Sequence, residues 1–443
     1  MTSPSSPSGE AVHESVSRAT KDDFEAWLRK GLGRAAILLR DKPDDADLNA
    51  LLLDACIENW AYDRQCEEGR APYLSGLIRI TGRAAAYRAA LEASLKAAAS
   101  GEPIDNVMQV FGILCRLTEQ DDADQTWLRD FVLTTENRAL ALDGAWELVR
   151  LQGLDALLAC VRRFGAEIVE DPWILTSITH ELEERDGAAS AATALAQARR
   201  DDPELCRLLG LAEVSARRVR PPTDVPTYAA LRAEVEHGVR RHFPRIWVLG
   251  AHPTEIEQVV ADLLSEPDEA KVRAYLSVFR HRAFPGDPTR LFPLLASANK
   301  RVAGAAARAL ALTCDPVVRS FGLQLVADGQ PALGLWLLFS NYRDDDLMLI
   351  RSELHQLSAD PDTHHHISFA VLDMIRDMTA PSDTARTIVL DIYEDGPCSL
   401  CRGRVVDRLA SMNGIPDWLP TEGRYDAEPS IVAHFAPSVP ADQ

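Results

Sequence analysis

Two cysteines near the C-terminal end of the sequence have the spacing of a chemical site. Cys398 and Cys401 stand three positions apart in the run "DGPCSLCRGRV". A Cys-x-x-Cys pair occurs in dithiol redox sites and forms half of many zinc sites. The same pair also fits a purely structural role, because free cysteine behaves as a small apolar side chain in protein cores. The surrounding residues decide between these roles.

The apolar pattern on both sides of the pair is helical. Before it, the apolar residues of 385–392 recur at the spacing of one helix face. The two thiols begin a second stripe of this kind, which continues to Met412. Pro397 fits the first turn of that helix. We therefore expect Cys398 and Cys401 to be core residues, with a redox pair or a metal site as the alternatives.

A zinc site would need further ligands, since zinc takes four sulfur or nitrogen atoms in structural sites. The run "THHHIS" is the other supplier in the sequence. Successive helical residues diverge by about 100°, so at most two of the three histidines can converge on one ion. The candidate metal ligands are Cys398, Cys401, His364 and His366. The simpler expectation is that the three histidines begin a helix and lie on its solvated side. We therefore expect no cofactor, with bound zinc as the alternative.

The stretch "NWAYDRQCEEGRAPYL", residues 59–74, is an unusual connection because it combines aromatic, basic and acidic side chains. Aromatic residues and Arg are enriched where proteins bind one another. A long loop that holds itself in place with ion pairs has the same composition, so both interpretations stay open. The candidate binding residues here are Trp60, Tyr62, Asp63, Arg64, Arg70 and Tyr73.

A second candidate binding segment is locally basic although the whole chain is acidic. Arg240, Arg241 and Arg245 stand close together within residues 217–245. Such a group is typical of a surface that faces an anion. The alternative is that these side chains pair with nearby carboxylates such as that of Glu234.

Residues 31–36, "GLGRAA", match the Gly-x-Gly-x-x-Ala form of a dinucleotide fingerprint. That fingerprint must follow a strand and open a helix. Here it lies within a pattern that is helical from Phe24 onward, so we expect no nucleotide site.

The elements that position these residues are predicted to be helices almost throughout. In "DPVVRSFGLQLVADG", Asp315 is placed as an N-cap, Pro316 at the first helical position and Gly329 as the stop. Similar segments of about 10–18 residues recur along the chain and are joined by short links. Sustained alternation of apolar and polar residues is scarce, so the fold class is predicted to be all-α.

Helices of this length with short links pack as antiparallel pairs, and many such pairs in line form an α-solenoid. The segment 268–330 resembles the HEAT repeat family in Pro293, in Arg301 with Val302, and in Val318 with Arg319. The repeats are degenerate, and the loop at 59–74 resembles bacterial helical-repeat proteins. The resemblance implies a curved array of stacked antiparallel helix pairs with a binding role.

The domain organisation follows from changes in composition. Residues 1–19 are rich in Ser and Pro, and "VRPPTDVPTY" contains three prolines that disfavour helix. The predicted segments are a disordered N-terminal segment (1–19), an N-terminal helical half (20–218), a Pro-rich break (219–225), a C-terminal HEAT-like half (226–426) and a Pro-rich tail (427–443).

Composition excludes several classes of function. The chain has 443 residues and a formal net charge of −20, which disfavours nucleic acid and anionic membranes as partners. No run of 18 apolar residues occurs, and the N-terminal residues lack the pattern of a signal peptide. The eight scattered cysteines are typical of a reducing compartment, so a cytoplasmic location is expected.

These observations favour a non-catalytic scaffold or adaptor that presents a concave helical surface to a protein partner of unknown identity. One alternative is a HEAT-like enzyme, such as a DNA glycosylase for alkylated bases, which would need a basic groove. The other is a redox- or zinc-responsive regulator acting through Cys398 and Cys401.

Overall fold

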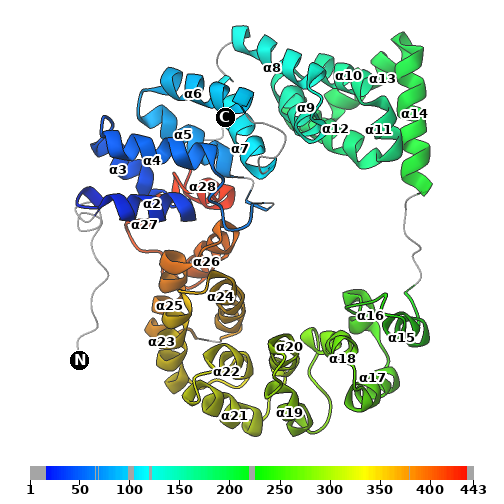
Figure 1. Ribbon diagram of the computed structural model, residues 1–443, viewed down its shortest axis with the longest axis vertical. Coiled ribbons are helices and arrows are strands. Elements are labelled where there is room, and N and C mark those ends of the chain that lie inside the picture. Colours follow the sequence, from blue (N-terminus) through cyan, green and yellow to red (C-terminus); the bar gives the residue numbers. More distant parts are fainter. Residues whose placement is uncertain are drawn as a thin grey trace, which may run out of the picture. The chain divides into compact units, whose positions relative to one another are not determined.

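A computed structural model describes residues 16–64, 66–67, 69–97, 104–118, 122–218, 225–378 and 380–436. These residues form α-helices and short 3-10 helices, and no strand occurs among them (Figure 1). The prediction of an all-α fold is therefore confirmed for this part of the chain.

The internal contacts divide the chain into two compact units, and the main boundary in the sequence falls between positions 222 and 223. Among the described residues, unit 1 comprises 16–218, 398–400 and 416–436, and unit 2 comprises 225–397 and 401–415. Most of the predicted break at 219–225 lies outside the described residues, as do 1–15 and 437–443 of the predicted terminal segments. Residues 416–426 group with unit 1, although the sequence pattern assigns them to the C-terminal half.

Unit 1 contains the following helices: α2 (Lys21–Lys30), α3 (Arg34–Asp41), α4 (Ala46–Ile57), α5 (Arg70–Ile80), α6 (Ala84–Ala97), α7 (Ile104–Thr118), α8 (Asp122–Thr134), α9 (Arg138–Gln152), α10 (Leu154–Arg163), α11 (Gly165–Glu170), α12 (Pro172–Asp186), α13 (Ala188–Asp201), α14 (Pro203–Arg218), α27 (Leu419–Gly423) and α28 (Pro429–Phe435).

Unit 2 contains these elements: α15 (Tyr228–Glu236), α16 (Arg245–Gly250), α17 (Pro253–Ser265), α18 (Glu269–Leu276), η1 (Ser277–Arg280), η2 (Pro288–Leu291), α19 (Phe292–Leu295), α20 (Lys300–Leu310), α21 (Pro316–Ala327), α22 (Pro331–Leu338), η3 (Asp344–Asp346), α23 (Leu347–Leu357), α24 (Pro361–Arg376), α25 (Asp383–Asp395) and α26 (Ser399–Ser411). The division between the units passes through the first turn of α26.

Local signals begin and end these helices as the sequence predicts. Asp315 caps α21 by accepting a hydrogen bond from the backbone N–H of Val317, and Pro316 occupies the first turn. Gly329 follows the helix with a φ of 75°, a left-handed conformation that favours glycine. The predicted limits of this helix are therefore confirmed.

In unit 1, one row of helices forms successive contacts. Each of α2, α4, α7, α9, α12 and α14 contacts the next member of this row. Their apolar faces fill one core around Phe24 and Leu52 and another around Phe111 and Leu148. Trp127 packs against both cores. The polar faces of α7, α9 and α12 lie outside these two cores, and residues on them line the groove described below.

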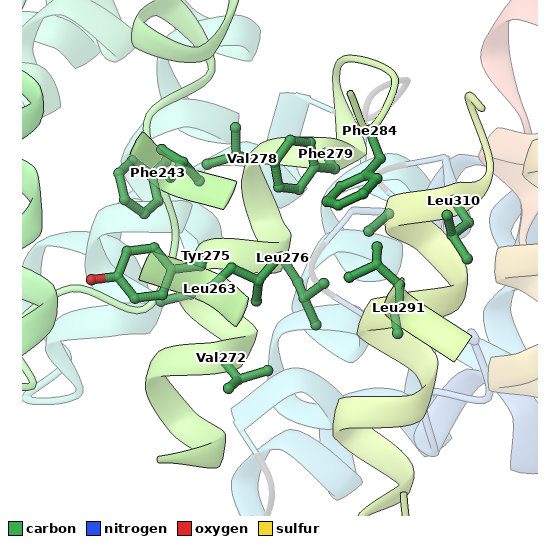
Figure 2. Packing of buried hydrophobic residues seen from close by; sticks show 14 of the residues in the cluster. Phe243, Leu263, Val272, Tyr275, Leu276, Val278, Phe279, Phe284, Leu291 and Leu310 are labelled. Atoms are coloured by element: carbon green, nitrogen blue, oxygen red, sulfur yellow. The ribbon is translucent and has the colours of Figure 1, made fainter. Parts of the chain in front are cut away.

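Unit 2 has a similar row, in which α18, α20, α22 and α24 contact one another in order. In its core, Tyr275 of α18 lies beside Phe243, whereas Leu276 and Phe279 lie on the side of Leu291 and Phe284 (Figure 2). Helix α20 buries one face in this core, since Val302, Ala306 and Ala309 stand at helical spacing and are each at most 2% exposed.

The C-terminal segment of unit 1 packs on its first helices, and α27 contacts α3 (Figure 1). The backbone N–H of Ala427 donates a hydrogen bond to the carbonyl oxygen of Gly31 at 2.9 Å. A Cβ added at Gly33 would overlap the carbonyl oxygen of Glu422, and one at Gly69 would overlap that of Ala427. These two glycines therefore allow the backbone of the C-terminal segment to approach closely.

This packing gives the Gly-x-Gly-x-x-Ala motif a structural role. Helix α2 ends at Lys30 and α3 begins at Arg34, so residues 31–33 form a junction instead of continuing one helix as expected. A helix precedes the junction, whereas the nucleotide fingerprint requires a strand. Within the described residues, no helix has both the length and the apolar character needed to cross a bilayer.

Candidate binding groove and metal-ligand cluster

Unit 1 contains a groove of about 750 Å³ along helices α5, α7, α9 and α12 and the loop before α5. Helices α7, α9 and α12 are successive members of the row described above. Most of the residues that line it are polar or charged, and the indole rings of Trp146 and Trp173 also belong to the lining.

Helix periodicity brings the groove residues of α9 to one face. Asp143, Trp146, Glu147 and Arg150 follow the i, i+3, i+4 and i+7 spacing and all line the groove. The opposite face of α9, which includes Leu148, is buried in the core. Core packing on one side therefore fixes the direction of the four polar and aromatic side chains on the other.

Helix α12 presents its groove residues in the same way. Trp173, Ser177, His180 and Glu181 lie on one face of this helix and line the groove. Ile178 and two other apolar residues of α12 are buried on its other side. Two neighbouring helices thus contribute one aromatic residue and at least one carboxylate each.

The carboxylates that line the groove differ in whether they form ion pairs with arginines. Glu147 forms ion pairs with Arg150 at 2.7 Å and with Arg116 at 3.5 Å. Burial raises the pKa of Asp143 to about 6, and the nearby charge of Glu147 adds to this effect. Within the described part of the chain, Asp143 forms no ion pair.

Glu181 is a second carboxylate in an unfavourable environment. Burial raises its pKa, and the charges of Glu184 and Glu147 raise it further, while Arg150 and His180 oppose the shift. Among the residues that the structure describes, Glu181 also forms no ion pair. Asp143 and Glu181 therefore place negative charge in the groove that the groove's own arginines leave largely uncompensated.

Trp146 and Trp173 line the same groove as these carboxylates. Their rings meet edge to face, with centroids 6.1 Å apart and an interplanar angle of 85°. Trp173 is 63% exposed, which is unusual for so large an apolar side chain. An exposed indole face next to carboxylates is a favourable environment for a Lys or Arg side chain.

Most candidate residues of the 59–74 loop have structural contacts. Trp60 donates from Nε1 to Glu58 at 3.2 Å and carries the Arg29 guanidinium 4.5 Å from its ring centre. The Asp63 carboxylate accepts a hydrogen bond from the backbone N–H of Cys66 at 3.2 Å. Tyr62 is half-buried.

Arg70 and Tyr73 connect α5 to the end of α2. The Arg70 side chain is buried and donates to the carbonyl oxygen of Leu28. The Tyr73 hydroxyl donates to the carbonyl oxygen of Leu32 at 3.0 Å. Arg64 is exposed, and it lines the groove together with Arg70. The loop thus forms part of the groove wall, while most of its polar side chains support the loop itself.

The predicted basic segment lies in unit 2, where its arginines have different environments. Arg240 forms an ion pair with Glu234, as the structural alternative predicts. Arg241 and Arg245 are exposed. Burial lowers the pKa of His242, and positive charges that include those of Arg280 and Arg241 lower it further.

The two thiols of the Cys-x-x-Cys pair lie at the start of α26 and are buried. Their sulfur atoms and a nitrogen of His365 all lie within 4.8 Å of one another. Cys401 Sγ is 3.6 Å from Nδ1 of His365, which belongs to α24. Within the ranges that the structure describes, these three side chains form the cluster that could hold a metal ion.

The two histidines chosen from the sequence as metal ligands occupy other positions. His364 is buried, with Ser368 Oγ 3.4 Å from its Nδ1. His366 is exposed, and its Nδ1 lies 2.7 Å from the carbonyl oxygen of Asp362. His365 stands between them in the sequence and faces the thiols. Which of the three histidines faces α26 depends on how α24 is oriented about its own axis, and the sequence alone does not show this orientation.

Comparison of the chain with family models, with curated proteins and with solved structures finds no match. The resemblance to HEAT repeats is therefore compatible with the all-helical architecture but has no support from a family match.

The candidate binding residues predicted from the sequence do not include the groove residues of α9 and α12. The sequence does contain a pattern that indicates them, because Trp and carboxylate residues repeat at helical spacing opposite an apolar stripe in both segments. Such a face is also common on solvated helices. Only the packing of α9 against α12 distinguishes a groove wall from ordinary surface.

Proposed function

We propose that this protein is a non-catalytic scaffold or adaptor of the α-solenoid type. In this proposal, the groove of unit 1 binds a Lys- or Arg-containing segment of a partner protein. The observation that carries the proposal is the pair of carboxylates, Asp143 and Glu181, beside an exposed tryptophan in that groove.

The contacts between helices support a solenoid. In both units, a row of helices forms contacts in chain order, as the stacked layers of helical repeats do. The groove residues of unit 1 come from successive members of one row, α7, α9 and α12. Repeat proteins use such rows to form an extended binding surface.

The charge distribution selects the type of partner. The pKa values of Asp143 and Glu181 are raised because each carboxylate is partly buried near other acidic groups. A cation from a partner would relieve both effects, since it stabilises the ionised form of each acid. Charge complementarity therefore favours a basic segment over an acidic one.

The tryptophans provide the apolar part of the same recognition. A Lys or Arg stem can lie along the Trp173 ring while its charged end reaches Asp143 or Glu181. Trp and Arg are the residue types most enriched at interface hot spots. The groove contains both types, since Arg64 and Arg150 lie at its wall.

The glycosylase alternative predicts a basic groove that faces phosphate groups. The uncompensated carboxylates of this groove would repel DNA. We expect no shift of duplex DNA in a mobility assay at about 10 μM protein and about 0.15 M salt, a protein concentration within the range of about 10⁻⁴–10⁻⁶ M in which non-specific DNA binders dissociate. Salt-dependent binding below that concentration would favour the glycosylase alternative over the scaffold.

The experiment that tests the proposed function is a selection of random peptides displayed on phage against the full-length chain. We expect enriched peptides to contain Lys or Arg, and the Asp143→Asn/Glu181→Gln variant to bind them at least tenfold more weakly. The Asp328→Asn/Asp345→Asn variant is the matched control, because it neutralises two carboxylates that are exposed in unit 2. Acidic or uncharged peptides, no enrichment, or equal binding by both variants would contradict the proposal.

A further inference from the structure

We infer that His365, Cys398 and Cys401 form a zinc site that links α24 to α26. This inference is independent of the groove and of the proposed scaffold function. It also departs from the expectation drawn from the sequence, in which the two thiols are packing residues.

The chain positions both thiols at one helix end. Helix α25 ends at Asp395, Gly396 and Pro397 turn the chain, and α26 begins at Ser399. Cys398 and Cys401 are three positions apart on one continuous stretch and therefore lie on the same side of the first turn. The helix N-terminus carries a positive partial charge that favours anionic ligands such as thiolates.

Helix α24 supplies the third group. His365 and Phe369 lie one turn apart on α24, and both face α26. The Arg404 guanidinium lies 3.9 Å from the centre of the Phe369 ring, next to the contact between His365 and Cys401. The relative position of the two helices is therefore defined by two adjacent contacts.

The separations match those of ligands around one zinc ion. With Zn–S bonds of about 2.3 Å and Zn–N bonds of about 2.1 Å, tetrahedral geometry places sulfur about 3.6 Å from nitrogen and about 3.8 Å from sulfur. Cys401 Sγ and His365 Nδ1 are 3.6 Å apart, and all three ligand atoms lie within 4.8 Å of one another. The ligand atoms therefore need little movement to bind the ion.

The chemistry of the ligands selects zinc among common metals. Thiolate and imidazole are preferred by zinc, whereas calcium and magnesium prefer oxygen ligands. An iron–sulfur cluster is usually held by four cysteines, and the described residues supply two at this place. Three protein ligands leave the fourth position of the ion for water or for a group from outside this set.

A zinc site differs from simple packing in its measurable consequences. If the two buried thiols and the half-buried histidine only pack, adding zinc or a chelator would leave the melting temperature unchanged. As ligands, they would couple zinc binding to the docking of α24 on α26, so bound zinc would raise the melting temperature.

The test is elemental analysis of the purified full-length chain after loading with zinc sulfate and desalting. We expect one zinc per chain in the wild type. Zinc should be lost in Cys398→Ser/Cys401→Ser, and His365→Ala should bind it more than about 100-fold more weakly, because losing even an outer-shell partner costs 10–100-fold.

The matched controls are His366→Ala, an exposed neighbour on α24, and Cys314→Ser, an exposed thiol outside this cluster. Both should retain one zinc. Circular dichroism of each variant shows whether it folds. If the ligand variants fail to fold, Co²⁺ titration of the metal-stripped wild type decides instead, since a thiolate-to-cobalt absorption band is then expected.

Several results would overturn the inference. Zinc well below one equivalent in the loaded wild type, or equal zinc in the ligand variants, would show that the three residues do not bind it. Loss of zinc to the same degree in His366→Ala would show that His365 is not the specific ligand. Stoichiometric binding of another metal in preference to zinc, or a Cys398–Cys401 disulfide in the protein as purified under reducing conditions, would also contradict it.

Discussion

Arg34 and Glu422 stand 388 positions apart in the sequence and form an ion pair at 3.0 Å inside unit 1. The Glu422 side chain is 1% exposed and that of Arg34 is 13% exposed. A carboxylate removed from water to this extent requires a close cation or several hydrogen bonds. The pair therefore holds α27 on α3 and, through it, the C-terminal segment on the first helices.

We expect Arg34→Ala to lower the free energy of unfolding by about 2 kcal/mol, because it removes a charge-assisted hydrogen bond to the buried Glu422 carboxylate. Arg29→Ala is the control, since Arg29 pairs with Glu25 on the surface at 2.8 Å and should contribute less than about 1 kcal/mol. Urea unfolding followed by circular dichroism measures both changes. Losses of equal size would show that the C-terminal segment is not held by this pair.

Glycine substitutions test the close approach of the same segment. Gly33→Ala should destabilise the fold strongly, because the added Cβ overlaps the carbonyl oxygen of Glu422 and backbone must move. Gly76→Ala, in the middle of α5 with nothing within 4 Å of the added atom, should stabilise it by about 0.5–1 kcal/mol. Melting temperatures of the two variants should therefore shift in opposite directions. A neutral Gly33→Ala variant would mean that residues 422–427 pack elsewhere.

The raised pKa of Asp143 predicts a pH-dependent change in stability. Its pKa is about 6 in the folded chain against an ordinary 3.8, so the protonated form favours folding and stability is lost as pH rises between these values. Asp143→Asn removes this loss and should be more stable than the wild type by about 1–2 kcal/mol above pH 7.

At pH 4 the advantage of Asp143→Asn should be small, because the wild-type acid is then protonated in the folded state. Urea titrations at pH 4 and pH 8 measure the difference. A variant that is equally stable relative to the wild type at both values would show that Asp143 titrates normally.

The reactivity of the cysteines should follow their burial. Cys66, Cys206 and Cys314 are exposed and should react first with iodoacetamide in the native protein. Burial raises the pKa values of Cys56 and Cys160 to about 12, so these thiols should react only on unfolding. Peptide mapping by mass spectrometry identifies the labelled positions. Early labelling of Cys56 would contradict the packing of α4.

The helices themselves are predictable from the sequence because their signals are local. N-caps such as Asp315, the proline after it and the apolar stripe of 385–392 each depend on neighbours within one or two turns. The break at Gly31–Gly33 is harder to predict. Gly31 ends α2 in a left-handed conformation, with a φ of 72°, which is a local signal. The close approach of Glu422 to Gly33 comes from the far end of the sequence, so local patterns do not show it.

The candidate sites show the same distinction. The Cys-x-x-Cys pair and the histidine run stand out in the sequence, but the choice of His365 over His364 or His366 depends on how α24 is rotated toward α26. The groove depends on α9 and α12 lying side by side, and neither segment shows this alone. Patterns within one segment therefore do not show which helices pack against each other, and both candidate sites depend on that packing.

A double-mutant cycle tests whether a cation of the partner binds beside Asp143. The cycle compares a selected peptide and its Lys→Gln form on the wild type and on Asp143→Asn, with dissociation constants measured by fluorescence polarisation at pH 7.5. We expect a coupling energy of at least about 1.5 kcal/mol, as for other close charge pairs across an interface. Additive losses, with a coupling below about 0.3 kcal/mol, would contradict it.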